Sequence, residues 1–210
     1  MAAQALAAGA VFEVRDGWEV AVTLPGASVA GSVGWADVSQ LRKLQLQGDA
    51  AALDTFAGRQ LPFAAAVRRQ RAWWCRLTPT RALVIGADPE LTAARAADAG
   101  IDLIDVTSCF GALTIAGPMA RETFARFCAI DLRDRVTPVG ALRPGSIGRQ
   151  PGILIREGQE RYLFLFGWAT GEYMWTLVAD AATQLGGGPI GVDQLDSFPL
   201  TADQGGSDDA

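Results

Sequence analysis

The chain has 210 residues, of which half are hydrophobic and a fifth are charged, and its formal net charge is −5. This length and composition are typical of one compact domain or of two small interlocked ones, and they exclude a disordered chain. The acidic balance gives no reason to expect nucleic acid as the main partner, and no run approaches the roughly 18 apolar residues of a membrane span.

The predicted elements alternate hairpins with single helices. Period-two apolar runs around turn residues predict hairpins over 11–24, 72–85 and 149–166. Apolar residues at helical spacing predict helices over 50–56, 91–99 and 171–185. Residues 1–10 are expected to be flexible or a short helix, and 186–210 a Gly-rich acidic tail. This order predicts an α+β fold, with helices packed on antiparallel sheets.

Specific turn residues fix the hairpins and one helix. The expected turns are Asp16-Gly17, 78–80 and 157–158, and the strand over 162–166 is apolar on both faces, which is typical of a central strand. Asp88 is expected to cap the helix over 91–99. The apolar side chains within the tail pack either on their own domain or on a partner.

Two stretches of the chain share one sequence pattern. In 35–56 and 104–124, an Asp-Val-Ser/Thr triplet precedes a Leu-x-Leu/Ile-x-Gly strand and then a helix. The matching positions are Asp37, Val38, Ser39, Leu44, Leu46 and Gly48 in one stretch and Asp105, Val106, Thr107, Leu113, Ile115 and Gly117 in the other. The second strand alternates as a half-buried strand does. The similarity predicts two pseudo-repeated halves, about 11–100 and 101–185; the alternative is chance likeness of two short β-α units.

The side chains needed for many catalytic mechanisms are missing. There is no histidine, which excludes histidine general bases and histidine metal ligands, and a Schiff base would have to use the single lysine, Lys43. Cys75, Cys109 and Cys128 are far apart, so no four-ligand zinc site is expected, and we interpret them as reduced thiols of a cytoplasmic protein. The N-terminus lacks the basic region of a signal peptide. No catalytic residue and no metal are predicted.

An arginine-rich stretch is the most asymmetric feature of the charge pattern. No acid lies between Asp54 and Asp88, and two tryptophans stand among the arginines there. The candidate interface residues are Arg68, Arg69, Arg71, Trp73, Trp74 and Arg76. Arginine and tryptophan are frequent anchors of protein interfaces, so a protein partner is the first interpretation. A solvated hairpin face with one tryptophan in the core is the alternative.

Three segments carry a resemblance to a known family. These are the Asp-Val-Ser triplet at 37–39, DVTSCFGALTIAGPMARETF, and ILIREG followed by YLFLFGWATGEYMWTLV. Together they resemble the aminomethyltransferase (glycine-cleavage T-protein) folate-binding superfamily over about 11–185. The size, and the expected lack of the C-terminal barrel domain, resemble the gamma subunit of heterotetrameric sarcosine oxidase more closely.

The chain departs from the family pattern at the folate site. An acidic pair of the family aligns with Gln70 and Arg71, and the family's pterin-binding glutamate block aligns with 148–152, which contains no glutamate. Because a carboxylate is what the N–H donors of a pterin need, these departures imply a fold that has lost its folate site.

The resemblance therefore implies a non-catalytic gamma subunit that carries no cofactor itself. The complex would contain alpha, beta and delta subunits, use FAD, FMN and NAD, oxidatively demethylate sarcosine or a related N-methyl amine, and pass the one-carbon unit to tetrahydrofolate on another chain. The alternative is a stand-alone folate-binding one-carbon transfer protein. In that case Arg71, Arg149 and Arg156 would hold the glutamyl carboxylates, and Trp73 or Trp74 would stack on the pterin.

Overall fold

The computed structural model describes residues 1–25 and 32–200, which form two compact units. The first unit contains residues 1–40, 109–139 and 143–200, and the second contains 41–108 and 140–142. The units therefore interlock along the chain. The chain passes from the first unit to the second near residue 40 and returns near residue 108, whereas the predicted halves meet near residue 100. No helix in the described ranges is long and apolar enough to span a membrane.

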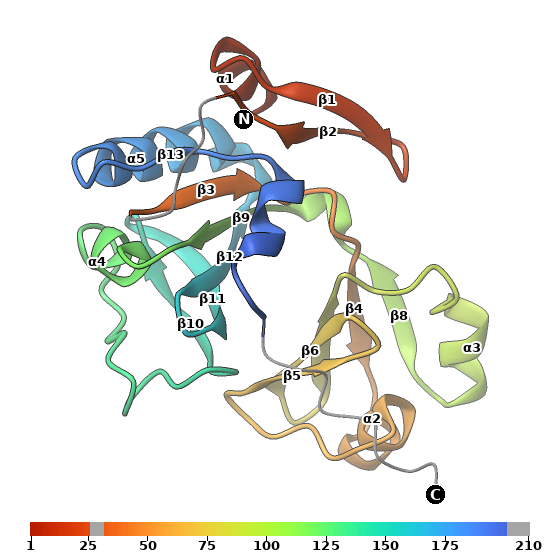
Figure 1. Ribbon diagram of the computed structural model, residues 1–210. Coiled ribbons are helices and arrows are strands. Elements are labelled where there is room, and N and C mark those ends of the chain that lie inside the picture. Colours follow the sequence, from red (N-terminus) through yellow and green to blue (C-terminus); the bar gives the residue numbers. More distant parts are fainter. Residues whose placement is uncertain (26–31, 201–210) are drawn as a thin grey trace, which may run out of the picture. The chain divides into compact units, whose positions relative to one another are not determined.

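The first unit is built on a six-stranded sheet with the strand order β10-β11-β12-β9-β3-β13 (Figure 1). Its strands are β3 (Gly34–Asp37), β9 (Phe110–Ala116), β10 (Leu142–Ile147), β11 (Gln150–Gly158), β12 (Arg161–Gly167) and β13 (Gly188–Pro189). A separate hairpin consists of β1 (Val11–Arg15) and β2 (Trp18–Thr23), and the helices are α1 (Ala2–Ala7), α4 (Ala120–Ala125) and α5 (Gly171–Thr183). The strand β12 is central, as predicted.

The second unit is built on a five-stranded antiparallel sheet with the order β5-β6-β7-β4-β8. Its strands are β4 (Lys43–Gln47), β5 (Ala66–Arg69), β6 (Ala72–Thr78), β7 (Arg81–Ile85) and β8 (Asp102–Asp105). Its helices are α2 (Ala50–Ala57) and α3 (Ala93–Asp98). Gly58 ends α2 in the left-handed conformation, as the sequence predicts.

The two sheets share one strand order, which confirms the internal repeat. In the first, β9 lies between β12 and β3, and in the second, β4 lies between β7 and β8. Asp37 pairs with Leu113 on β9, and Asp105 pairs with Leu44 on β4. Each Asp-Val-Ser/Thr triplet therefore lies beside the central strand of the other copy, and this crossing explains why the units interlock.

Hydrogen bonds in the two triplets repeat the same pattern. The carboxylate of each aspartate accepts from the backbone N–H two residues later, at 3.0 Å for Asp37 and 2.9 Å for Asp105. The Ser39 hydroxyl accepts from the Ala112 N–H at 3.0 Å, and the Thr107 hydroxyl accepts from the Lys43 N–H at 2.9 Å. The triplet thus ends one strand and bonds to the start of the next strand in its sheet.

Three local predictions need correction. The strand β9 is buried along Gly111–Ala116 rather than half-buried, because it is a central strand. The helix predicted over 91–99 begins at Ala93 with Thr92 as its cap, and Asp88 instead accepts from the Glu90 N–H at 2.8 Å. The turn predicted at 157–158 is at 159–160.

The C-terminal segment packs on its own unit as far as the structure describes it. The strand β13 pairs in parallel with β3, and Ile190 and Leu195 are buried. Of the two predicted alternatives for these apolar side chains, packing on their own domain is the one observed. Residues 201–210 of the predicted acidic tail lie outside the described residues.

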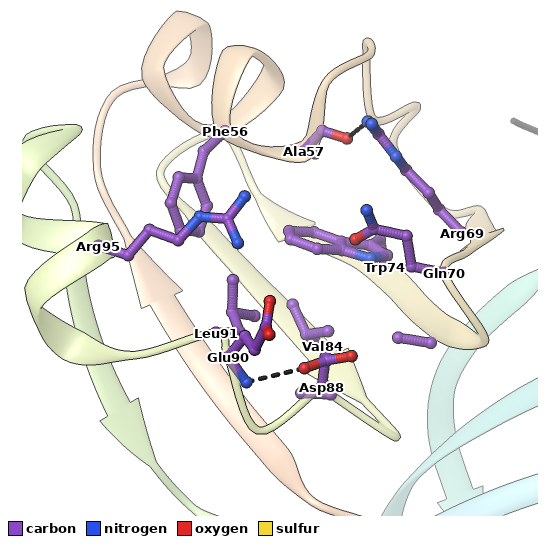
Figure 2. Close-up of a pocket in the computed structure, with 12 residues that line it drawn as sticks. Phe56, Ala57, Arg69, Gln70, Trp74, Val84, Asp88, Glu90, Leu91 and Arg95 are labelled. Carbon is purple, nitrogen blue, oxygen red and sulfur yellow. Dashed lines mark hydrogen bonds between the residues drawn. The ribbon is translucent and has the colours of Figure 1, made fainter.

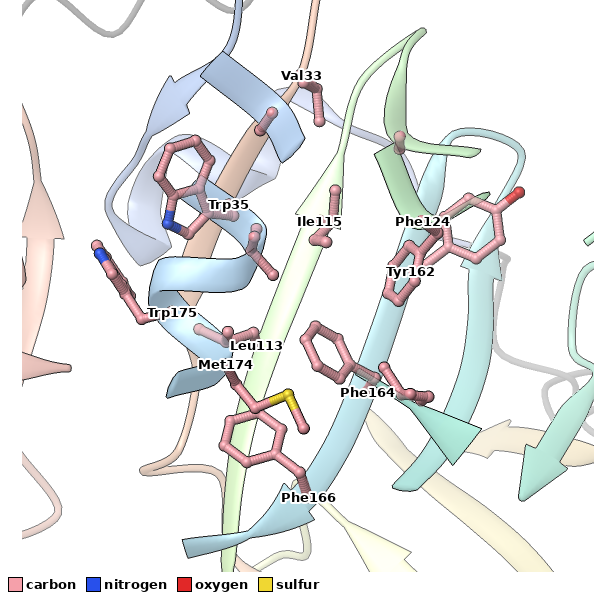
Figure 3. Packing of buried hydrophobic residues seen from close by; sticks show 14 of the residues in the cluster. Val33, Trp35, Leu113, Ile115, Phe124, Tyr162, Phe164, Phe166, Met174 and Trp175 are labelled. Atoms are coloured by element: carbon pink, nitrogen blue, oxygen red, sulfur yellow. The ribbon is translucent and has the colours of Figure 1, made fainter. Parts of the chain in front are cut away.

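The first unit has an aromatic core (Figure 3). Phe124, Phe164 and Phe166 are in contact, with ring centroids 5.1 Å apart for Phe124 and Phe164 and 5.4 Å apart for Phe164 and Phe166. Helix α5 covers this cluster with Met174 and Trp175. On this helix Tyr173 is exposed and Trp175 is buried.

Candidate functional site

A pocket of about 210 Å³ opens in the second unit among α2, the β5–β6 turn and the segment that leads into α3 (Figure 2). At roughly 30 Å³ per water molecule, this volume holds about seven waters. The floor is apolar and includes Trp74, Val84 and Leu91. The polar side chains of its lining are Arg69, Gln70, Asp88, Glu90 and Arg95. The pocket therefore combines an apolar base with charges of both signs.

Local structure positions each wall of the pocket. Strands β5 and β6 are joined by Gln70 and Arg71, both with positive φ, as in the tight turns that fit the twist of a hairpin. That turn places Arg69 and Gln70 at one side. The ring of Phe56 on α2 contacts Trp74 edge-on, with centroids 6.3 Å apart.

The pocket exists because α3 is short and rich in alanine. Its six residues contribute Ala96 to the core of the second unit. The thirteen-residue α5 contributes Met174, Trp175 and Val178 to the core of the first unit. Small side chains on α3 leave space over the β7 side of the sheet that the larger side chains of α5 would fill.

Some polar groups of the pocket already have partners. The Arg69 guanidinium donates to the Ala57 carbonyl, and the Asp88 carboxylate accepts from the backbone N–H of Glu90. Trp74 is 4% exposed, yet its indole Nε1–H has no hydrogen-bond partner within the described residues. Buried donors are nearly always paired, so this nitrogen requires an explanation.

Arg76 and Arg156 occupy matching positions in the two units. Arg76 pairs with Ala82 on β7, and Arg156 pairs with Tyr162 on β12, each next to a register shift. Both are buried, and each donates to the carbonyl three residues later, at 2.7 Å for Arg76 and 3.0 Å for Arg156. Their acidic partners are Asp54 and Asp134. These arginines therefore stabilise strand ends and loops, which is a structural role.

Among the described residues, the arginine–tryptophan face that the sequence predicts is not formed by all six of its residues, because three of them are buried. Trp73, Trp74 and Arg76 are buried, because adjacent tryptophans on a strand point to opposite faces and both faces of β6 are covered. Of the remaining candidates, Arg71 is exposed, while Arg68 and Arg69 are half-buried. Whether these three contact another protein stays a prediction.

The residues proposed for a folate site are divided between the two units, and several of them are buried or already bonded. Trp73 and Trp74 are buried. Arg156 donates to the Asp134 carboxylate at 2.6 Å and to the Thr137 carbonyl at 2.8 Å. Arg71 and Arg149 are each in a hairpin turn with positive φ, in different units. Arg69 and Trp74 are the two predicted site residues that line the pocket.

Sequence reasoning missed the other ten residues of the lining, among them Phe56, Glu90 and Arg95. The available signal is the pair of acids, Asp88 and Glu90, that precedes an alanine-rich helix containing Arg95. The sequence predicts only a helix cap there, and the packing of α2 against the sheet is what brings Phe56 to the same place.

The pKa shifts of several described side chains point away from acid–base or thiol chemistry at those groups. Burial raises the pKa of Cys75 far above its usual range, and burial also raises the pKa of Cys128. A hydrogen bond from Arg133 lowers the pKa of Asp131 to about 2, and a hydrogen bond from Arg156 lowers the pKa of Asp134. A general acid needs the opposite shift, towards neutrality. Within the described ranges, no group of three potential metal ligands occurs.

Comparison with known proteins defines the fold. No protein-family model matches the chain, and no curated protein matches it. The structure is similar to a chain of the heterotetrameric sarcosine oxidase from Corynebacterium sp. U-96, with a TM-score of 0.66 and 22% identity over 73% of this chain and 85% of that chain. It is also similar to the glycine cleavage system aminomethyltransferase T from Bartonella henselae, with a TM-score of 0.70 and 14% identity over 93% of this chain.

These likenesses confirm the fold that the sequence motifs predict. The chain has the aminomethyltransferase-like α+β fold, and no closed barrel occurs in the described part. It spans about three-fifths of the length of the aminomethyltransferase, because its match covers 60% of that protein.

Proposed function

We propose that this chain is a non-catalytic subunit, of the gamma type, of a sarcosine oxidase-like heterotetramer. The observation that carries the proposal is the extent of the two matches. The chain covers 85% of the matched oxidase chain but 60% of the aminomethyltransferase. The given sequence corresponds to most of that oxidase chain, which supports a component of such an assembly.

The chemistry of the described residues supports a structural role. The buried Arg156 holds a loop and a strand end through its hydrogen bonds, and the carboxylates with shifted pKa values are shifted away from general acid behaviour. In the proposed complex, FAD, FMN and NAD bind the other subunits. The assembly oxidises sarcosine or a related N-methyl amine, and tetrahydrofolate accepts the one-carbon unit on another chain.

Exposed apolar side chains support assembly with larger partners. Val14 on β1 and Trp168 after β12 are 74% and 69% exposed, and Leu6 and Val11 are also exposed. Contiguous groups of such side chains are characteristic of interaction sites. These residues replace the buried tryptophans as candidate contacts with the alpha, beta or delta subunit.

A tagged pull-down from the native host tests the proposal. We expect a yellow complex whose absorbance shows two flavins and whose mass spectrum shows larger co-purifying chains. The variant Val14→Asp, Trp168→Asp should lose these chains, whereas Glu122→Gln on the surface of α4 should retain them. A colourless, monodisperse single chain would contradict the subunit role.

A stand-alone folate-binding protein is the second candidate, and the TM-score of 0.70 over 93% of the chain favours it. Titration of the purified chain with a reduced folate, followed by tryptophan fluorescence, separates the two candidates. The subunit proposal predicts no change up to high micromolar folate. A saturable change that is lost in Arg149→Gln would establish the alternative.

A further inference from the structure

The pocket of the second unit has one buried donor without an acceptor, in Trp74, and two exposed charged side chains, Glu90 and Arg95. Among the described residues, the side chains of Arg95 and Glu90 make no hydrogen bond or ion pair, and the indole N–H of Trp74 is buried without an acceptor. Figure 2 shows the side chains of Arg95 and Glu90 reaching into the pocket from the side of α3. The groups left open are one cation, one anion and one buried donor.

The remaining polar side chains of the lining do not change this balance. Arg69 is held by the Ala57 carbonyl, and Asp88 is held by the N–H of Glu90. Together the four charged residues of the lining sum to zero, so neither a simple anion nor a simple cation is favoured by the site as a whole. A ligand that carries both a positive and a negative charge matches the side chains of Glu90 and Arg95.

We propose that this pocket binds a small apolar α-amino acid in its zwitterionic form. The carboxylate pairs with Arg95 and accepts from the indole N–H of Trp74, and the ammonium group pairs with Glu90. The apolar side chain lies against Phe56 and Leu91 in the lining. The proposal gives the buried indole N–H of Trp74 an acceptor, and it places the two exposed charges of the pocket against opposite charges of the ligand.

The size of the pocket restricts the ligand. A volume of about 210 Å³ is below the roughly 300–1,000 Å³ of sites for drug-sized ligands, and it fits a molecule the size of valine. All residues of the lining belong to the second unit, so binding does not depend on whether the chain assembles with an oxidase. Failure of one proposal therefore leaves the other standing.

Tryptophan fluorescence of the full chain at 1 μM tests the proposal with three probes of one shape. These are valine, isovalerate, which lacks the amino group, and isobutylamine, which lacks the carboxylate. We expect a saturable change with valine in the millimolar range or below, and at least tenfold weaker binding of the other two. Arg95→Gln and Glu90→Gln should each weaken valine binding at least tenfold. The matched surface variants Arg81→Gln and Asp98→Asn should bind as the wild type does.

Two further variants identify the pocket as the place of binding. The chain has six tryptophans, and the signal must disappear in Trp74→Phe. Val84→Phe, which fills the pocket and retains Trp74, must abolish valine binding. No change with valine up to 50 mM would overturn the proposal, and so would equal binding of isovalerate or isobutylamine, or valine binding that survives in Val84→Phe.

Discussion

Phe164 on β12 of the first unit and Val84 on β7 of the second hold the same place in their sheets, because they pair with Leu113 and Leu44 on the corresponding central strands. Around Phe164 the space is filled by other aromatic rings and by α5. Val84 is also buried in a core cluster, but it lies at the edge of that cluster and lines a pocket. One strand order thus supports either a closed core or a binding site, and the side chains of the covering helix decide which.

The largest effect is expected from removing the two matching arginines. Arg156→Ala should cost about 3–5 kcal/mol of unfolding free energy, because it leaves the carbonyl oxygens of Thr137, Gly158 and Gln159 without their donor. Arg76→Ala should cost about 2–3 kcal/mol, since Arg76 has fewer partners and its Nε–H is already unpaired. Pulse proteolysis in urea measures both. Arg126→Ala, at an exposed position, is the control and should stay within about 0.5 kcal/mol; the reverse order of costs would contradict the comparison.

A larger side chain separates a filled core from a pocket. Leu113→Phe in the first unit should cost about 1–3 kcal/mol, because the core has no room for the added atoms. Val84→Phe in the second unit should change the unfolding free energy by less than about 1 kcal/mol, since the ring enters the pocket. Urea unfolding of the two variants gives the difference directly. Equal costs would mean that the pocket is not available space.

The repeated hydroxyl groups should give equal, smaller effects. Ser39→Ala and Thr107→Val each remove the acceptor of a strand-starting N–H, so each should cost about 1 kcal/mol. Ser197→Ala, an exposed hydroxyl on a C-terminal turn, serves as control and should be neutral within about 0.5 kcal/mol. If one of the two substitutions is neutral and the other is costly, the triplets are alike in sequence without sharing a structural task.

The smallest effect concerns acid stability. The pKa of Asp134 is lowered in the folded state by Arg156, so its contribution is complete above the usual aspartate pKa near 4 and is lost as pH falls through the lowered value. Asp134→Asn should therefore lower the unfolding free energy at pH 7, and its difference from the wild type should shrink towards pH 2. Unfolding curves recorded between pH 7 and pH 2 test this. A difference that stays constant with pH would show that the charge of Asp134 is not what stabilises the loop.

Residues that act through local chemistry were predictable from the sequence. The hairpin around Asp16-Gly17, the Gly58 helix end and the strand–glycine–helix repeat follow from turn conformations and apolar periodicity. Gly117 has positive φ, and a side chain there would collide with the Ser32 carbonyl, so the corner after β9 requires glycine. The family resemblance, and with it the α+β fold, also came from short motifs.

Tertiary structure alone decided which of these residues face solvent and which share a site. The alternation of apolar and polar residues does not distinguish a central strand from a strand with one covered and one free face. The sequence therefore predicts that β9 is half-buried and that Trp73 and Trp74 lie on a surface. Phe56, Trp74, Glu90 and Arg95 are separated by up to 39 positions, and they line one pocket because α2 and the segment before α3 both cover the same sheet. Packing over long sequence separations, rather than local preference, creates that pocket.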